Sequence, residues 1–126
     1  LALACEKETA APLNTEEVEG SWVLVEVLFD PGDGSGTFEP SDAGFEITLN
    51  NDNTFEANFH VCRVFEQGNR NTGAFTRIGG QEVLIPCSGS ILNGIQGRLE
   101  SGHLVFYYPC VEPCIYKFRK TADLRE

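Results

Sequence analysis

The most reactive side chains in this sequence belong to its five cysteines, Cys5, Cys62, Cys87, Cys110 and Cys114. Cys5 lies far from the others, and the other four allow three pairings. Cys62 and Cys87 each end a predicted strand, and Cys110 and Cys114 flank one proline-containing corner, so we predict the disulfides Cys62–Cys87 and Cys110–Cys114. Five cysteines in a chain this short favour an oxidising compartment, either the periplasm or the cell surface.

Metal binding by the same region is a weaker alternative. His60 and Cys62 are two residues apart and would share one face of a strand, so Cys87 could join them at a zinc ion. A disulfide uses the same sulfurs more readily in an oxidising compartment. A weak calcium candidate is the loop with Asp30, Asp33 and Ser35, although its spacing does not match an EF-hand. We therefore predict no metal and no other cofactor.

Catalytic motifs are not evident in the sequence. It contains neither a Gly-x-Ser-x-Gly elbow nor a His-Glu-x-x-His helix. The 19 acidic residues guarantee some accidental carboxylate pairs, so such pairs carry no argument for a glycosidase. We predict that the protein has no catalytic residues and is not an enzyme.

Short β-strands are predicted to position these side chains. Apolar and polar residues alternate along segments of about 5 to 10 residues, separated by turns such as Asn50-Asn51-Asp52-Asn53 and Gly79-Gly80. The predicted strands are 21–29, 45–49, 54–62, 73–78, 82–87, 90–99, 103–108 and 115–120. Their short sequential connections predict an all-β fold, an antiparallel up-and-down barrel of about eight strands. Bulky apolar residues on one face predict a mostly filled interior with at most a small cavity near one mouth.

Length and charge limit the classes of function. A chain of 126 residues argues for one domain, which we place at 18–120, after an N-terminal segment and flexible tether at 1–17 and before a tail at 121–126. The net charge of −10 opposes binding to nucleic acid and docking on anionic lipid. No segment reaches the roughly 18 apolar residues of a membrane-spanning helix.

The N-terminal sequence resembles the end of a bacterial lipoprotein signal. Small and apolar residues, Leu1-Ala2-Leu3-Ala4, precede Cys5, and a polar run follows it. The resemblance implies that Cys5 is lipidated, which would also account for the odd number of cysteines. It further implies a protein of the cell envelope, held at the periplasmic or outer surface of a membrane through the lipid alone.

A second resemblance covers roughly residues 18–120. Gly20-Ser21-Trp22 resembles the G-x-W motif of lipocalins, whose tryptophan closes the bottom of the barrel under a basic residue of the last strand, here Arg119 or Lys120. The segments 22–38 and 108–114 look like small lipocalin-like lipoproteins of the Bacteroidetes, a group without an assigned function. The resemblance implies a lipocalin or calycin-like fold.

These observations predict a non-catalytic lipocalin-like lipoprotein that binds a small hydrophobic ligand. The candidate lining residues are Phe45, Phe55, Phe59, Phe106 and Tyr108. The alternative is an inhibitor or other protein-interaction module that acts through exposed loops at 30–44 and 109–114. The sequence does not identify the ligand or the protein partner.

Overall fold

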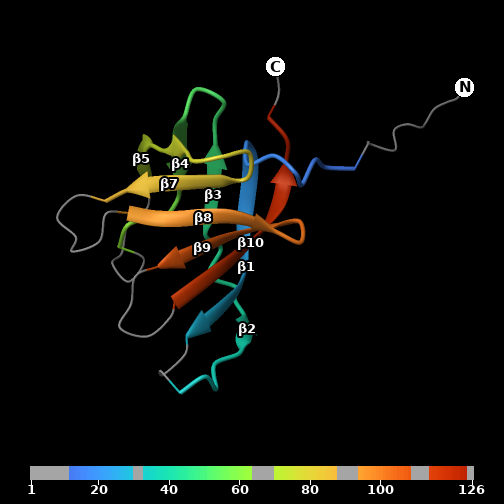
Figure 1. Ribbon diagram of the computed structural model, residues 1–126, viewed down its shortest axis with the longest axis vertical. Coiled ribbons are helices and arrows are strands. Elements are labelled where there is room, and N and C mark those ends of the chain that lie inside the picture. Colours follow the sequence, from blue (N-terminus) through green and yellow to red (C-terminus); the bar gives the residue numbers. More distant parts are fainter. Residues whose placement is uncertain (1–11, 30–32, 64–69, 88–93, 109–113, 125–126) are drawn as a thin grey trace, which may run out of the picture.

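The computed structural model describes residues 12–29, 33–63, 70–87, 94–108 and 114–124, and these residues form an all-β protein without a helix (Figure 1). The strands are β1 (Gly20–Phe29), β2 (Phe38–Pro40), β3 (Glu46–Leu49), β4 (Thr54–Ala57), β5 (Asn71–Ala74), β6 (Thr76–Arg77), β7 (Glu82–Pro86), β8 (Gly94–Glu100), β9 (His103–Tyr108) and β10 (Cys114–Ala122). Within the described part of the chain, no helix is long and apolar enough to cross a membrane.

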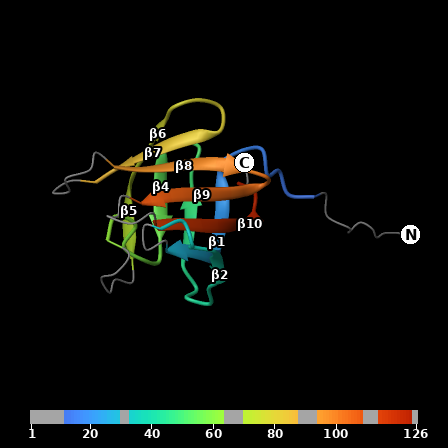
Figure 2. The same ribbon diagram turned by 60° about the horizontal axis from the view of Figure 1, so that its bottom comes forward.

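The strands form one antiparallel sheet that is nearly closed into a barrel. Its order is β5-β4-β3-β1-β10-β9-β8-β7-β6, with the short β2 paired to β1 beside this path. The order can be followed around the molecule in Figure 2. The two end strands, β5 and β6, are consecutive in the chain and separated only by Phe75. If β5 and β6 are counted as one bent strand and β2 is set aside, the predicted eight-stranded up-and-down barrel is confirmed.

The first strand is apolar on both faces because a β-bulge changes which residues point inward. Leu24 pairs with Phe118 and Val27 pairs with Tyr116, with a register shift between Leu24 and Glu26. Before the shift the even-numbered residues face the core, and after it the odd-numbered ones do. The far end of β1 therefore continues the inner face with Val27.

Inward-facing residues fill the barrel. Buried aromatic and aliphatic side chains come from every long strand, and Trp22, Phe59, Phe106 and Phe118 are the largest that are fully buried. Gly97 makes room for one of these rings, because a Cβ there would lie 2.9 Å from the ring of Phe106. Close packing of this kind supplies most of the stability of a small β-domain.

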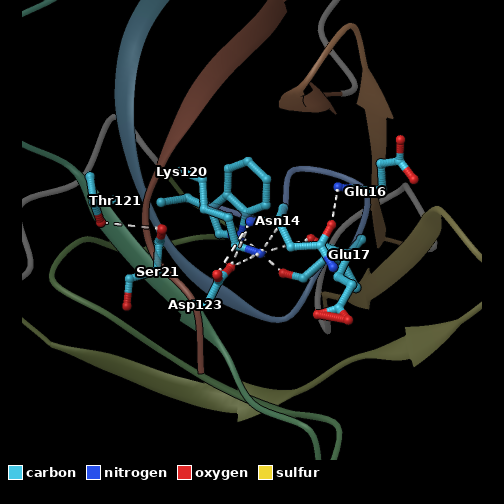
Figure 3. A network of polar contacts seen from close by, with 9 residues as sticks. Asn14, Glu16, Glu17, Ser21, Lys120, Thr121 and Asp123 are labelled. Atoms are coloured by element: carbon cyan, nitrogen blue, oxygen red, sulfur yellow. Dashed lines mark hydrogen bonds and ion pairs between the residues drawn. The ribbon is translucent and has the colours of Figure 1, made fainter. Parts of the chain in front are cut away.

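One end of the barrel is closed by Lys120 (Figure 3). Its ammonium group lies over the Trp22 ring, donates to the Asn14 and Glu17 carbonyls, and pairs with Asp123. The Trp22 indole N–H donates to the Val18 carbonyl at 2.9 Å.

A glycine and a lysine complete this closed end. Gly20 has a φ of +134°, and a Cβ there would collide with the side chain of Lys120. Of the two predicted partners of Trp22, Lys120 is correct and Arg119 is wrong, because Arg119 is on the opposite, exposed face of β10.

Several predicted boundaries shift. The strand predicted over 54–62 ends at Ala57, and the loop predicted over 30–44 contains β2. The predicted tether contacts the barrel from Asn14 onward, and β10 extends into the predicted tail as far as Ala122. Ala57, Phe59 and Val61 are nevertheless buried as the alternation predicted.

The disulfide Cys62–Cys87 is confirmed, with 5.7 Å between its Cα atoms. It links residues 25 apart in sequence and is expected to contribute about 3 kcal/mol to stability by restricting the unfolded chain. Cys114 is also disulfide-bonded. Cys110 and Cys5 lie outside the described residues, so the pairing Cys110–Cys114 and the lipidation of Cys5 stay predictions.

Candidate functional site

The barrel has a second end, opposite to Lys120. Trp22 pairs with Lys120 near one end of the β1–β10 ladder, and Phe29 pairs with Cys114 at the other. Tyr108, the last residue of β9, also pairs with Cys114. Phe29 and Tyr108 therefore mark the open end, which no residue corresponding to Lys120 covers among those described.

A pocket of about 520 Å³ lies at this end, against the extension of β1 and the loop that carries β2. Its described lining residues are Val27, Phe29, Ser35, Gly36, Thr37, Glu39, Pro40 and Ser41. Val27 and Glu39 are directly paired across β1 and β2, so their side chains share one face of the sheet. The bulge in β1 places this face in continuity with the inside of the barrel.

Seven aromatic rings connect this pocket to the core. Each ring contacts the next, with centroids between 4.5 and 6.2 Å apart. The row is Phe45, Phe59, Phe118, Phe106, Tyr108, Tyr116 and Phe29. Its inner rings are buried, whereas Phe29 is 49% exposed and lines the pocket. The row thus passes from a packed interior to an aromatic surface that is open to a ligand.

The hydroxyl group of Tyr108 is an unusual polar group within this row of rings. It is inaccessible to solvent and has no hydrogen-bond partner among the residues that the structure describes. Burial raises the pKa of Tyr108 well above 10.0, with a further contribution from Tyr116, so the hydroxyl stays protonated and able to donate. A buried hydroxyl without a partner costs about 1–3 kcal/mol, and such groups are rare in folded proteins.

The β1–β2 hairpin beside the pocket is held from its other face. Lys117 of β10 forms an ion pair with Glu26 at 3.1 Å, and its ammonium group lies 4.1 Å from the centre of the Phe38 ring. On the pocket side, the Thr37 hydroxyl donates to the Glu39 carboxylate at 3.2 Å. Glu39 is the only acidic group among the described lining residues, and no basic residue accompanies it.

Of the five residues predicted to line a ligand site, most lie in the packed core and one lies at the open end. Phe55, Phe59 and Phe106 are buried in the core, and Phe45 is half-buried and stacks on Phe59 at 4.5 Å. Tyr108 lies at the open end.

Sequence reasoning did not name four residues of the open end as part of a ligand site: Phe29, Tyr116, Thr37 and Glu39. Thr37 and Glu39 do fall in the loop 30–44 of the protein-interaction alternative. The alternation of Tyr116, Phe118 and Lys120 could have identified Tyr116 as inward-facing. No local signal in the sequence identifies the other three.

The calcium candidate is not supported by the described residues. Asp30 lies outside them, and hydrogen bonds from the hydroxyl and amide of Ser35 lower the pKa of Asp33 in a local turn. The disulfide occupies both sulfurs of the zinc alternative. Within the described residues, no three His, Cys, Asp or Glu side chains are gathered to hold a metal ion.

Comparison with protein-family models, curated proteins and solved structures finds no significant match to this chain.

Proposed function

We propose that this protein is a non-catalytic, lipocalin-like lipoprotein that binds a small, mainly apolar ligand at the open end of its barrel. The observation that carries the proposal is the Tyr108 hydroxyl, which has no partner among the described residues and lies two ring contacts away from Phe29, a lining residue of the pocket. A ligand group that accepts its hydrogen bond once the Tyr108 ring turns toward the pocket would recover the cost of burying it.

The shape of the open end limits the ligand. A pocket of about 520 Å³ falls in the range typical of small-molecule sites. The packed core rings leave the ligand to bind at the mouth, with its apolar part on Phe29 and Val27. Glu39 disfavours an anionic head group, so the expected ligand is not an anion and carries one hydrogen-bond acceptor. With so few polar contacts, binding is expected to be weak.

A place in the cell envelope is part of the same proposal. Two features support it: the lipoprotein-like sequence that ends at Cys5, and the disulfide-bonded cysteines, which suit an oxidising compartment. Cys5→Ser is expected to release the native protein from the membrane fraction, because acyl chains contribute about 0.8 kcal/mol per buried methylene to membrane binding. Native protein found wholly in the soluble fraction would contradict the lipid anchor.

The ligand site can be tested by titrating isotope-labelled protein with decan-1-ol and following amide and aromatic NMR signals. Saturable shifts are expected at Phe29, Glu39 and Tyr108. Tyr108→Phe should weaken binding about five- to tenfold, the effect of one lost hydrogen bond. Tyr107→Phe is the matched control, because the Tyr107 side chain belongs to the opposite face of β9 and its hydroxyl donates to Glu100.

Two other outcomes would contradict the proposed site. Shifts centred on Phe59 and Phe106 would place the ligand deep inside the barrel. Absence of any saturable shift at the solubility limit of decan-1-ol would argue against an apolar site at the open end.

A further inference from the structure

The barrel wall has one seam where two neighbouring strands do not pair. Among the described residues, β5 pairs only with β4, and β7 pairs with β8 and with the two residues of β6. The pairing of β6 with β7 stops at Leu84. On the β5 side of Phe75, β5 and the last residues of β7 are therefore not paired with each other. An open pocket of about 370 Å³ occupies this seam.

Both ends of the seam are fixed. At one end, Phe75 joins β5 directly to β6, and its amide donates to the Asn53 carbonyl at 2.9 Å. At the other end, the disulfide ties Cys62 to Cys87, just beyond β7. The neighbouring amide of Val61 donates to the Asn71 side chain at 2.9 Å, which holds the disulfide-bearing turn against the start of β5. Within the described residues, the seam is therefore a gap in the wall whose two ends are fixed.

Hydrogen bonding around β4 shows which backbone groups of β5 face the seam. Thr54 uses both of its backbone groups elsewhere: its carbonyl accepts from Asn50, and its amide donates to Asp52. Thr54 and Ala74 are therefore a non-hydrogen-bonded pair of the antiparallel ladder. Because such pairs alternate with hydrogen-bonded ones, Thr72 is also turned away from β4.

Two amides and two carbonyls thus point from β5 into the seam. They belong to Thr72 and Ala74, both of which are exposed and line the pocket. The strand itself is Asn-Thr-Gly-Ala, with small side chains that leave this edge accessible. An edge of this kind is a template for one further strand.

The facing edge of β7 does not offer the same template. The Ile78 amide donates to Glu82, so alternation directs Leu84 and Pro86 of β7 toward the β6 side. Leu84 is paired with Thr76, and Pro86 has no backbone N–H. A segment that enters the seam would therefore pair with β5 rather than with β7.

Charge in the seam differs from that of the protein as a whole. The chain has a net charge of −10, yet no described lining residue of this pocket is acidic, and His60 and Arg63 belong to its wall. Apolar contact comes from the Phe55 ring, which lies against Gly73. The site thus combines a strand edge, an aromatic surface and a basic group.

We propose that the seam binds an extended peptide segment of another protein, which pairs with Thr72 and Ala74 as an added strand and places a carboxylate near His60. Main-chain hydrogen bonds would supply the affinity, as in other cases of strand addition. A second barrel is a poorer fit, because β7 and the disulfide wall off the edge of β5 and admit a single chain more easily than a whole sheet.

The test uses a synthetic pentapeptide of alternating threonine and valine with a free C-terminal carboxylate. Amide hydrogen exchange of the intact protein is measured with and without it. In the free protein, Asn71 and Gly73 are expected to be protected by β4, whereas Thr72 and Ala74 exchange rapidly. The peptide should slow exchange at Thr72 and Ala74 alone.

Two variants separate main-chain pairing from other effects. Thr72→Pro removes an amide that faces the seam but not one that bonds to β4, so it is expected to fold and to weaken peptide binding about tenfold. Thr72→Val keeps the amide and should bind like the parent protein. A peptide with N-methyl groups at every residue, which blocks both of its edges, should not bind, and amidation of its carboxylate should weaken binding at low salt.

Each alternative outcome would overturn the proposal. Protection of Thr72 and Ala74 without peptide, increasing with protein concentration, would identify a second copy as the occupant. Concentration-independent protection would mean that the chain itself covers the edge. No protection at millimolar peptide, or equal binding by Thr72→Pro and Thr72→Val, would exclude strand addition at β5.

Discussion

The ammonium group of Lys120 is buried 5.3 Å from the centre of the Trp22 ring, at the closed end of the barrel. It also contacts the Asn14 carbonyl at 2.5 Å, the Glu17 carbonyl at 3.2 Å and the Asp123 carboxylate at 2.9 Å. The hydrogen bond from Lys120 is the main cause that lowers the pKa of Asp123. One side chain therefore links the first described segment, the core tryptophan and the end of the last strand.

Replacement of this lysine should destabilise the fold. Lys120→Met keeps most of the apolar stem but leaves two carbonyls without their donor and removes the ion pair with Asp123, and we expect a loss of about 2–3 kcal/mol in the free energy of unfolding. Urea denaturation followed by Trp22 fluorescence would measure it. Lys117→Met is the control, because its partly exposed ion pair with Glu26 should be worth less than about 1 kcal/mol. Equal losses for both variants would show that Lys120 makes no special contribution.

Two neighbouring tyrosines should respond oppositely to loss of the hydroxyl. Tyr108→Phe removes a buried hydroxyl that has no partner in the described part of the chain, so the ligand-free protein is expected to gain about 1 kcal/mol. Tyr107→Phe removes the hydroxyl that donates to Glu100, and a loss of about 1 kcal/mol is expected. Thermal unfolding of both variants beside the parent tests this. A destabilised Tyr108→Phe would mean that its hydroxyl has a partner in solution.

Ionisation of the tyrosines should lower the free energy of unfolding at high pH. The chain has three tyrosines, and burial is the first cause that raises the pKa of each, to about 12 for Tyr107. A raised pKa in the folded state stabilises the protein below the ordinary value of 10.0, and this contribution is lost as the pH rises above it. Absorbance titration of the native protein should show no tyrosine ionising with the ordinary pKa. A fraction that does so in the folded state would contradict the burial described for that ring.

The aromatic row should be structural in its interior and dispensable for folding at its outer end. Phe59 is 2% exposed and stacks on Phe45, so Phe59→Ala is expected to cost about 3–5 kcal/mol. Phe29→Ala removes a ring that is 49% exposed, and its cost should be below about 1 kcal/mol while decan-1-ol binding weakens. Denaturation and ligand titration on the same two variants distinguish these roles. A small loss for Phe59→Ala would indicate an interior with room for a ligand.

The sequence predicts the barrel well because alternation is a local property of each strand. The side chains of 54–62 face the predicted way even though the strand ends at Ala57. The choice between Arg119 and Lys120 was also within reach, since Lys120 continues the alternation of Tyr116 and Phe118. The bulge in β1 was not predictable, because it depends on the register with β10.

The candidate sites were less predictable because they arise from long-range geometry. The pocket at the open end requires β2 to pair with β1, and a three-residue strand inside a turn-rich segment gives almost no signal. Tyr108 was identified as an inward-facing ring, but its lack of a hydrogen-bond partner depends on every neighbour in the folded barrel. The seam depends on where the pairing of β5 and β6 diverges, which the single residue Phe75 does not reveal.

The hydrogen bonds between the Asn14 amide and the Asp123 carboxylate also bear on how a lipid-anchored protein would be oriented relative to the membrane. They hold the chain before β1 and the chain after β10 together at the pole that Lys120 closes. If Cys5 carries the proposed lipid, roughly nine residues connect it to Asn14, and they span at most about 30 Å. The barrel would then rest close to the bilayer on its closed pole, with Tyr108 and Phe29 directed away from the lipid, and ligands would be exchanged with the aqueous compartment.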